Sequence, residues 1–278
     1  MEKITTTTDE LISDTEIKSI NQALMAKYGI DFTQYEKTSF KRRLLRLMHK
    51  HGINNSVELW MRFLHDPNFV ESFKEGISVG LTEMFRNPSV WNYIHDYIKK
   101  LETGSSKINI WHAGCSTGEE FYSMAITAQE AGIFSKCQFL CTDMSLSAVE
   151  KTESGIYDLD LLAAFETNYR HFNPNGNFKL YYTTGKETLT FSKNLKEQAH
   201  FWQSNLVTDH VEGKFDIIFC RNVMIYFEDD LKLKIIQKLH NGLLPNGLLV
   251  IGHFDALPKG SEAFFDYENS SLKIFKKI

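Results

Sequence analysis

Features of several common protein classes are missing from this sequence. No apolar run approaches the ~18 residues that would suggest a membrane span, and the start of the chain lacks a signal peptide's apolar core. The four cysteines show no CxxC spacing, which argues against a zinc site or a disulfide framework. We therefore expect reduced core thiols, no bound metal, and a cytoplasmic protein that does not insert into a membrane.

The chain also lacks an excess of positive charge. Its formal net charge is −4, from 31 Lys and Arg against 35 Asp and Glu. A molecule with this balance is not a general binder of polyanions, so we expect no nucleic-acid partner. Any attraction to a charged partner has to come from a local patch.

The first part of the chain, up to about residue 100, has a helical pattern. Apolar residues recur at helical spacing within residues 14–30, 39–53, 56–66 and 68–81. We expect Asp14 or Thr15 to cap the first helix, and Gly29 and Gly52 to end the first two. This pattern predicts a helical N-terminal domain with its linker over residues 1–88.

From residue 107 short apolar runs alternate with amphipathic stretches. Runs at 107–111, 137–143, 215–220 and 247–253 predict strands, and alternation with helices predicts a mostly parallel sheet over residues 89–278. Residues from about 155 to 200 interrupt this alternation. Within them, "FKLYYTTGKETLTF" predicts a β-hairpin inserted into the α/β domain.

The stretch "INIWHAGCSTGEEFYSMAI", residues 108–126, has the layout of a strand, a glycine-containing turn and a helix. Ligands of such sheets bind at this turn, yet Ser116 replaces the middle glycine of the dinucleotide fingerprint. Glu119 and Glu120 at the helix start would repel a phosphate and favour a cation. S-adenosylmethionine, with its sulfonium and ammonium groups, fits this site. The alternative is that both acids only complement the helix dipole.

A second acid supports a nucleoside ligand. Asp143 ends the strand expected at 137–143, where an acid can accept hydrogen bonds from both ribose hydroxyls. The alternative role of Asp143 is the N-cap of the following helix, and both roles can coexist.

Four stretches together closely resemble one family. "LTEMFRNPSVW", "WHAGCSTGEEFYSMAI", "FDIIFCRNVMIYF" and "LLPNGLLVIGHFDAL" occur in the order and spacing of the chemotaxis-receptor glutamate methyltransferases, the CheR family. The resemblance runs from about residue 15 to the C-terminus. It implies an α/β fold: a Rossmann-like S-adenosylmethionine-dependent methyltransferase domain with a small inserted antiparallel β-subdomain, preceded by an all-α N-terminal domain.

The resemblance also implies the ligands and their residues. The cofactor is S-adenosyl-L-methionine, the product S-adenosyl-L-homocysteine, and the partner an acidic helical cytoplasmic region of a chemoreceptor-like protein, which receives glutamate methyl esters. The positions implied to bind the cofactor are Thr82 and Arg86 from the linker, Ala113, Gly114 and Glu119 at the methionine part, Asp143 at the ribose, Asn205 and Leu206 at the adenine, and Arg221 and Asn222 near the sulfonium.

Arg86 and Tyr226 are the expected catalytic residues. A glutamate is already ionised at neutral pH, with a reference pKa of about 4.3, so its methylation needs no general base. An arginine and a tyrosine hydroxyl can hold the carboxylate that attacks. The alternative role of Arg86 is a surface arginine that caps a helix end, and the alternative role of Tyr226 is a core aromatic. His253 is interpreted as a structural residue.

This sequence departs from the family pattern at a few positions. Phe121 stands where proline is usual, and Gly80 where asparagine is frequent. The last motif usually reads GHSE, whereas here Phe254 and Asp255 follow the histidine. This departure bears on the substrate side. Two other functions stay open: methylation of a carboxylate on a non-receptor protein or small molecule, and a cofactor-sensing module without turnover, against which the retained Arg86 and Tyr226 argue.

A basic face is expected on the second helix. Residues 37–57 contain no acid, and Arg42, Arg46 and Lys50 are spaced four apart, while Phe40, Leu44, Leu47 and Met48 form the opposite apolar stripe. We expect Arg42, Arg43, Arg46 and Lys50 to dock an acidic helical partner. The alternatives are a solvated helix face and a nucleic-acid patch, and the second lacks aromatic side chains for base stacking.

Overall fold

The computed structural model describes residues 12–77, 82–101 and 107–278. The chain divides into two compact units, residues 1–79 with 226–232 and residues 80–225 with 233–278. Residues 82–88, which the sequence pattern groups with the helical domain, therefore belong to the second unit. No helix within the described ranges is long and apolar enough to cross a membrane.

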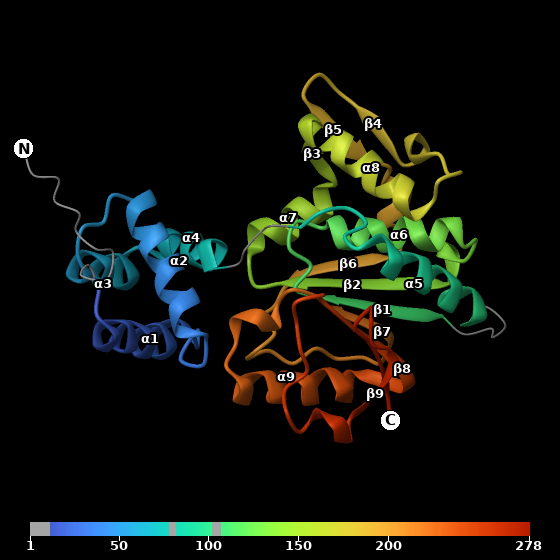
Figure 1. Cartoon of the computed structure of the whole chain (residues 1–278). Coiled ribbons are helices and arrows are strands. Elements are labelled where there is room, and N and C mark those ends of the chain that lie inside the picture. Colours follow the sequence, from blue (N-terminus) through green and yellow to red (C-terminus); the bar gives the residue numbers. More distant parts are fainter. Residues whose placement is uncertain (1–11, 78–81, 102–106) are drawn as a thin grey trace, which may run out of the picture. The chain divides into compact units, whose positions relative to one another are not determined.

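The first unit is helical, as predicted (Figure 1). Its helices are α1 (Asp14–Tyr28), α2 (Lys37–Lys50), α3 (Ser56–His65) and α4 (Pro67–Ile77). Phe32, Phe63 and Phe73 form the aromatic centre, with ring centroids 4.8 to 5.2 Å apart at Phe73. Residues 78–81, the end of the predicted fourth helix, lie outside the described residues.

The ends of α1 show how local chemistry sets a helix boundary. The predicted N-cap, Asp14 or Thr15, is wrong: Ser13 is the cap. Its hydroxyl accepts a hydrogen bond from the Glu16 amide at 3.3 Å, and the Glu16 carboxylate accepts one from the Ser13 amide at 2.7 Å. Such a reciprocal pair requires an acid three residues after the cap, which selects Ser13. Gly29 ends the helix with a φ of 67°, as predicted.

The second unit contains a seven-stranded sheet in the order β6-β2-β1-β7-β8-β10-β9. The strands are β1 (Ile108–Ala113), β2 (Cys137–Asp143), β6 (Ala199–Gln203), β7 (Phe215–Cys220), β8 (Leu243–Ile251), β9 (Phe265–Asn269) and β10 (Ile274–Lys277). The first five in the sheet order run parallel, and β10 and β9 are antiparallel additions. The predicted mostly parallel sheet is confirmed.

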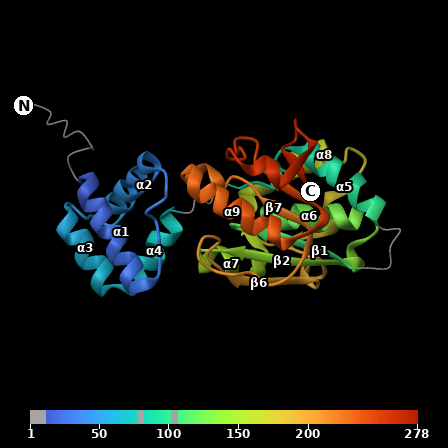
Figure 2. The ribbon, with the colours of Figure 1, turned by 90° about the horizontal axis from the view of Figure 1, so that it is seen from below.

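Helices cover both faces of this sheet. The helices are α5 (Pro88–Leu101), α6 (Glu119–Glu130), α7 (Leu146–Ser154) and α9 (Asp229–Gly242). Figure 1 shows α5 and α6 on one face and α9 on the other, and Figure 2 views the unit from the side of α9. The central strands are almost wholly buried, and all four cysteines lie in this core. Such a doubly covered parallel sheet places ligands at the carboxyl ends of its strands.

The predicted insertion forms a separate three-stranded sheet, in the order β3-β5-β4. The expected hairpin consists of β4 (Tyr182–Thr184) and β5 (Thr188–Phe191), which pair antiparallel. The sequence pattern did not predict β3 (Ile156–Asp158) or α8 (Leu162–Phe172), which complete the insertion.

Candidate functional site

The turn between β1 and α6 is tight and depends on two glycines. The amides of Gly114 and Cys115 both donate to the Thr142 carbonyl, at 2.8 and 2.9 Å. Gly114 and Gly118 have φ values of 87° and 96°, where other residues are strained. A Cβ on Gly118 would also stand 2.6 Å from Cγ2 of Thr152. The backbone therefore turns sharply at the carboxyl edge of the sheet, where the sequence predicted a ligand.

Asp143 lies beside this turn, because β2 is the parallel neighbour of β1. Its Oδ2 accepts a hydrogen bond from the Ser116 amide and its Oδ1 accepts one from the Ser145 amide, both at 2.9 Å. The N-cap of α7 is Ser145, so the alternative role of Asp143 as that cap is wrong. Burial raises the pKa of Asp143, and the backbone hydrogen bonds oppose this shift. The Met144 amide is a further backbone donor to this carboxylate, so these three donors do not fill its four acceptor positions.

Glu119 is the first residue of α6 and is only 4% exposed. The Thr117 hydroxyl donates to its Oε2 at 2.7 Å. Burial raises the pKa of Glu119, while the bond from Thr117 and the charges of Lys151 and Arg86 act in the opposite direction. A buried carboxylate at this turn is suited to a positively charged ligand.

Glu120 is engaged differently from its neighbour. Its Oε1 lies 2.9 Å from Nδ1 of the buried His112, and its Oε2 accepts a hydrogen bond of 3.4 Å from Nη1 of Arg221. Arg221 is 8% exposed, and its Nη2 donates to the Arg86 carbonyl at 3.0 Å and to Oδ1 of Asn87 at 2.9 Å. Burial lowers the pKa of Arg221. Arg221 thus binds the Arg86 carbonyl and the Asn87 side chain, and Glu120 in turn accepts a hydrogen bond from Arg221.

Arg86 is brought to the segment that follows β7. Its Nη1 donates to Oδ1 of Asn222 at 2.9 Å, and its Nε lies 3.6 Å from a Glu83 carboxylate oxygen. The neighbouring Phe85 amide donates to the Ser123 hydroxyl on α6 at 2.7 Å. Arg86 is only partly exposed, so it is not a simple surface arginine. Thr82, also predicted at the site, is partly exposed a few residues earlier.

Asn205 and Leu206 lie in the loop after β6, next to the end of β2. The Ser204 amide donates to the Asp143 carbonyl at 2.8 Å, which joins this loop to the turn. Nζ of Lys238 donates to the Leu206 and Val207 carbonyls at 2.6 and 3.1 Å. The structure therefore brings the predicted adenine loop and the predicted ribose acid together.

Tyr226 belongs to the first unit, where its ring lies under Arg43. The Arg43 guanidinium carbon is 3.8 Å from the ring centroid, and the Tyr226 carbonyl accepts a hydrogen bond of 2.9 Å from the Glu36 amide. Arg43 is only 4% exposed. It therefore does not share the solvent-exposed face expected for it, because stacking on Tyr226 turns it inward.

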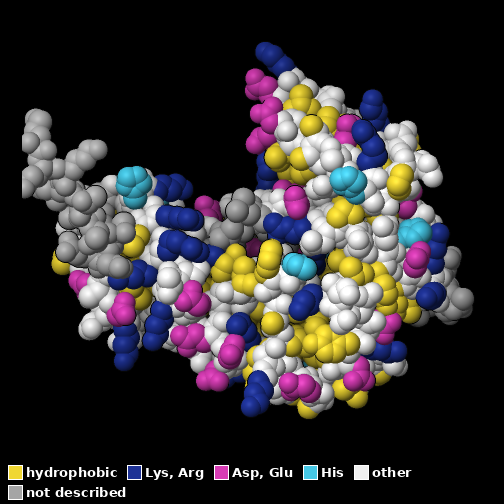
Figure 3. All heavy atoms as spheres, in the orientation of Figure 1, with side chains coloured by type: hydrophobic (Ala, Val, Ile, Leu, Met, Phe, Trp, Pro, Cys, Tyr) yellow, Lys and Arg dark blue, Asp and Glu magenta, His cyan; other side chains and the backbone are white. Residues whose placement is uncertain are grey.

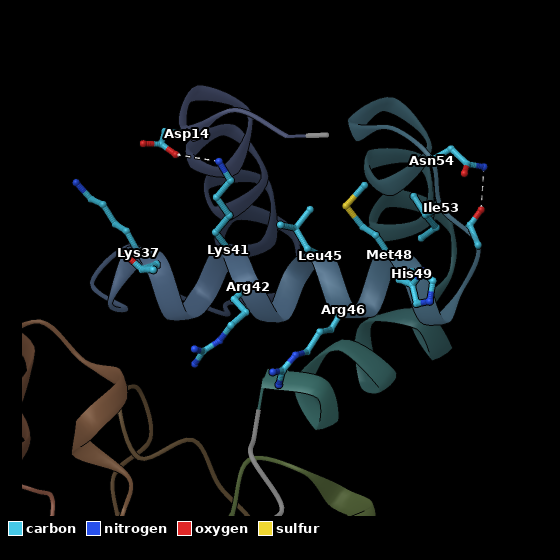
Figure 4. A pocket seen from close by; sticks show the side chains of 12 residues that line it. Asp14, Lys37, Lys41, Arg42, Leu45, Arg46, Met48, His49, Ile53 and Asn54 are labelled. Carbon is cyan, nitrogen blue, oxygen red and sulfur yellow. Dashed lines mark hydrogen bonds and ion pairs between the residues drawn. The ribbon is translucent and has the colours of Figure 1, made fainter. Parts of the chain in front are cut away.

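Most of the remaining basic residues of α2 border a groove of about 830 Å³, and Lys50 is not among its lining residues. Figure 4 shows Lys37, Lys41, Arg42 and Arg46 along the groove, beside the apolar side chains of Leu45, Met48 and Ile53. Arg42, Arg46 and Lys50 are exposed, and Phe40, Leu44, Leu47 and Met48 are buried, as the helical spacing predicted. Figure 3 shows several Lys and Arg side chains close together on this unit. One acid, Asp14 of α1, reaches the groove and lies 4.0 Å from Lys41.

Comparisons with known proteins agree with this arrangement. Residues 80–273 match the family described as "CheR methyltransferase, SAM binding domain", and residues 15–77 match "CheR methyltransferase, all-alpha domain". A Pseudomonas putida protein named "Putative methyltransferase Cher3" is 32% identical over 88% of this chain and 90% of its own length. The chain belongs to the CheR methyltransferase family. It is an S-adenosylmethionine-dependent methyltransferase, as the resemblance implied.

Further relatives of this CheR-family chain carry the chemotaxis name. A "Chemotaxis protein methyltransferase" of Listeria innocua is 28% identical over 81% of this chain and 83% of its own length. The "Chemotaxis protein methyltransferase 1" of Vibrio cholerae is 28% identical over 91% of this chain and 93% of its own length.

The site residues of this CheR-family chain fit the cofactor chemically. The buried Glu119 carboxylate suits a ligand that carries cationic groups and no phosphate, and the Asp143 carboxylate retains acceptor capacity for a hydroxyl donor. The helix-start pattern alone does not distinguish Glu119 from Glu120, and only the family resemblance singled out Glu119. The sequence analysis also missed the structural work of Asp255, whose carboxylate accepts a hydrogen bond of 2.6 Å from the Asn222 amide.

Proposed function

We propose that this enzyme methylates the γ-carboxylate of glutamate residues in the acidic helical cytoplasmic region of a chemoreceptor-type protein. The observation that carries the proposal is the pairing of Arg86 with Asn222 at the carboxyl edge of the methyltransferase sheet. Arginine is the side chain best suited to grip a carboxylate through parallel hydrogen bonds. The chemotaxis names of the relatives support the choice of substrate.

Methyl transfer to a carboxylate requires little acid–base catalysis by the protein. S-adenosylmethionine supplies the activated methyl group when bound. Since a glutamate carboxylate is ionised at neutral pH, no proton has to be removed from it. The residues must instead align the acceptor oxygen, exclude water and hold the second carboxylate oxygen. We assign this last task to Arg86 and to the hydroxyl of Tyr226.

For the cofactor we propose specific contacts. Glu119 faces the cationic methionine part, next to the backbone at Ala113 and Gly114. Asp143 accepts hydrogen bonds from the ribose hydroxyls, and the loop at Asn205 and Leu206 flanks the adenine. The short link from Ser204 to Asp143 supports this order, because it sets the ribose and adenine positions side by side.

For the protein substrate we propose that α2 provides the docking face. The lining of its groove combines basic side chains (Lys37, Arg42 and Arg46) with apolar ones (Leu45, Met48 and Ile53), a composition suited to an acidic amphipathic helix. Lys50 extends this face by one turn. Arg43 is left out of the docking face, since it is buried against Tyr226.

The test is incubation with cofactor radiolabelled in its methyl group and, in parallel, with the membrane fraction and the soluble fraction of bacterial cells. Base-labile label on a membrane protein is the expected result, because methyl esters hydrolyse in base. Label on soluble proteins or small molecules only would instead indicate another carboxylate acceptor. If the protein binds the cofactor but transfers no label to any fraction, it is a sensing module and the proposal is wrong.

A further inference from the structure

Asp255 is a buried carboxylate that joins two loops at the carboxyl edge of the sheet. It is 2% exposed. Its Oδ2 accepts hydrogen bonds from the amides of Asn222 at 2.6 Å and Gly252 at 2.8 Å, and its Oδ1 accepts one from the Ile225 amide at 3.1 Å. The segment after β7 is thereby fixed to the segment after β8.

These bonds hold Asn222 in an unusual conformation. Asn222 has a φ of 60°, in the left-handed region that residues other than glycine seldom adopt. The Gly252 backbone also packs closely against Asn222, because a Cβ on Gly252 would stand 2.7 Å from the Asn222 amide nitrogen. The direction of the Asn222 side chain is therefore determined by the backbone that Asp255 anchors.

The Asn222 side chain contacts the guanidinium of Arg86 and so affects its orientation. Its Oδ1 accepts the 2.9 Å hydrogen bond from Nη1 of Arg86. The Arg86 backbone has an anchor outside this segment, since Nε1 of Trp91 on α5 donates to its carbonyl at 3.1 Å, beside the 3.0 Å bond from Nη2 of Arg221. Asp255 is therefore linked to the orientation of the Arg86 guanidinium and not to the conformation of the Arg86 backbone.

We propose that Asp255 is a positioning residue for methyl transfer, which acts through Asn222 to orient the Arg86 guanidinium. The inference rests on the proposed catalytic role of Arg86. Asp255 itself touches neither acceptor nor cofactor in this scheme. Asp255→Asn is the informative change, because it keeps the size of the side chain but replaces one acceptor oxygen with an NH₂ group that faces backbone donors.

The experiment compares Asp255→Asn and Asp255→Glu with the parent, and uses Asp266→Asn as the control. Asp266 is an exposed acid on β9, so the same chemical change is made far from the loop contacts. We expect Asp255→Asn to lower kcat about 10²-fold, the size of effect that follows from misplacing a reacting group by about 1 Å. KM for the protein substrate should change much less. Asp255→Glu, which restores a carboxylate, should recover a large part of kcat.

Two further measurements separate positioning from loss of structure. In an Arg86→Ala background, Asp255→Asn should cause no further loss of kcat, because the group that it orients is gone. The side-chain NMR signal of Arg86 in protein with ¹⁵N-labelled arginine should shift or broaden in Asp255→Asn and stay unchanged in Asp266→Asn. Independent, multiplicative losses in the double variant, or an unchanged Arg86 signal, would overturn the proposal.

The outcomes also separate this inference from the proposed function. The NMR measurement requires no substrate, so it tests the link from Asp255 to Arg86 even if receptors are not methylated. If Arg86→Ala retains full turnover, the proposed catalytic role fails while a shifted Arg86 signal still shows the link. If Asp255→Asn is unfolded by circular dichroism, Gly252→Ala makes the same comparison, because its Cβ would crowd Asn222 directly.

Discussion

The guanidinium of Arg86 donates a hydrogen bond of 2.9 Å to the side-chain oxygen of Asn222, which is 136 residues away in the chain. This contact joins the segment before α5 to the loop after β7, two of the stretches that carry the family resemblance. Neither segment alone contains all the residues proposed for methyl transfer. The contact between Arg86 and Asn222 therefore leads to a prediction for catalysis.

Arg86→Ala should lower kcat for methyl transfer about 10²-fold, the order of effect that follows from misplacing a reacting group by about 1 Å. Binding of the cofactor should stay within about tenfold of the parent, since the proposed partner of Arg86 is the incoming carboxylate. Turnover with a receptor substrate and calorimetry with the cofactor check the two parts. A large loss of cofactor affinity would reassign Arg86 to cofactor binding, and near-normal turnover would remove it from the site.

Tyr226→Phe should lower kcat about 10- to 100-fold, the effect of losing one hydrogen bond to a charged group. The protein should remain as stable as the parent, because the phenyl ring still lies under the Arg43 guanidinium, 3.8 Å from its centroid in the parent. Turnover and thermal unfolding measured on one preparation test both statements. Tyr226→Leu, which removes the ring as well, should lose stability in addition. Equal turnover in the parent and Tyr226→Phe would contradict the role of the hydroxyl.

Asp143→Ala should weaken cofactor binding about 10- to 100-fold, since hydrogen bonds to a charged group contribute roughly 1.5–3 kcal/mol. The structure adds a cost in stability, because the amides of Ser116 and Ser145 lose their acceptor. Each buried donor left without a partner costs about 1–3 kcal/mol. Calorimetry and denaturant unfolding separate the two effects. An unchanged dissociation constant in the folded variant would place the ribose elsewhere.

Glu119 should make cofactor binding depend on pH. Burial raises its pKa above the ordinary 4.5 in the ligand-free protein. A cationic ligand prefers the carboxylate, so its affinity should rise with pH through the raised pKa. The stability of the ligand-free protein should change in the opposite sense. Because Glu119 binds its proton more strongly in the folded state than in the unfolded chain, its contribution to the free energy of unfolding falls as pH rises from 4.5 to the raised pKa.

The control for this pH dependence is Glu119→Gln, which cannot ionise. Calorimetric titrations of parent and variant over mildly acidic pH give the comparison. The variant should bind more weakly at neutral pH and show a flatter pH profile. Parallel profiles in the two proteins would assign the pH dependence to other groups, such as Asp143.

Features set by neighbouring residues could be predicted from the sequence. The helix end at Gly29 and the alternation of strands with helices depend on short-range chemistry, and the structure confirms them. The predicted N-cap, Asp14 or Thr15, is one or two residues too late, because the cap is selected by the pairing of Ser13 with Glu16. Local patterns therefore predicted the architecture well, and its boundaries less well.

Features set by distant partners could not be predicted in this way. Glu119 and Glu120 are adjacent, yet one pairs with Thr117 nearby while the other meets Arg221, 101 residues on. The sequence pattern assigns Arg43 to an exposed basic face, whereas in the structure its guanidinium stacks on the Tyr226 ring. These roles depend on the packing of segments that are remote in the chain, and no single stretch of sequence contains that information.

The exposed face of α2 gives the prediction for the protein substrate. The double variant Arg42→Glu, Arg46→Glu should bind the cofactor normally but methylate its protein substrate far more slowly at low salt, because a basic face steers an acidic partner. Rising ionic strength should slow methylation by the parent and reduce the difference in rate between the parent and the double variant, because the Debye length falls from about 30 Å at 0.01 M to about 8 Å at 0.15 M. Initial rates at both salt concentrations measure this.

The matched control for this variant is Lys99→Glu, Lys107→Glu, which makes the same change in net charge at exposed positions of the α/β unit. Its rate should stay near that of the parent, because it leaves the α2 groove intact. If both double variants were slowed equally, overall charge and not α2 would govern encounter with the substrate. If the folded α2 variant matched the parent at both salt concentrations, its basic side chains would only be solvated, and docking would rest on another surface.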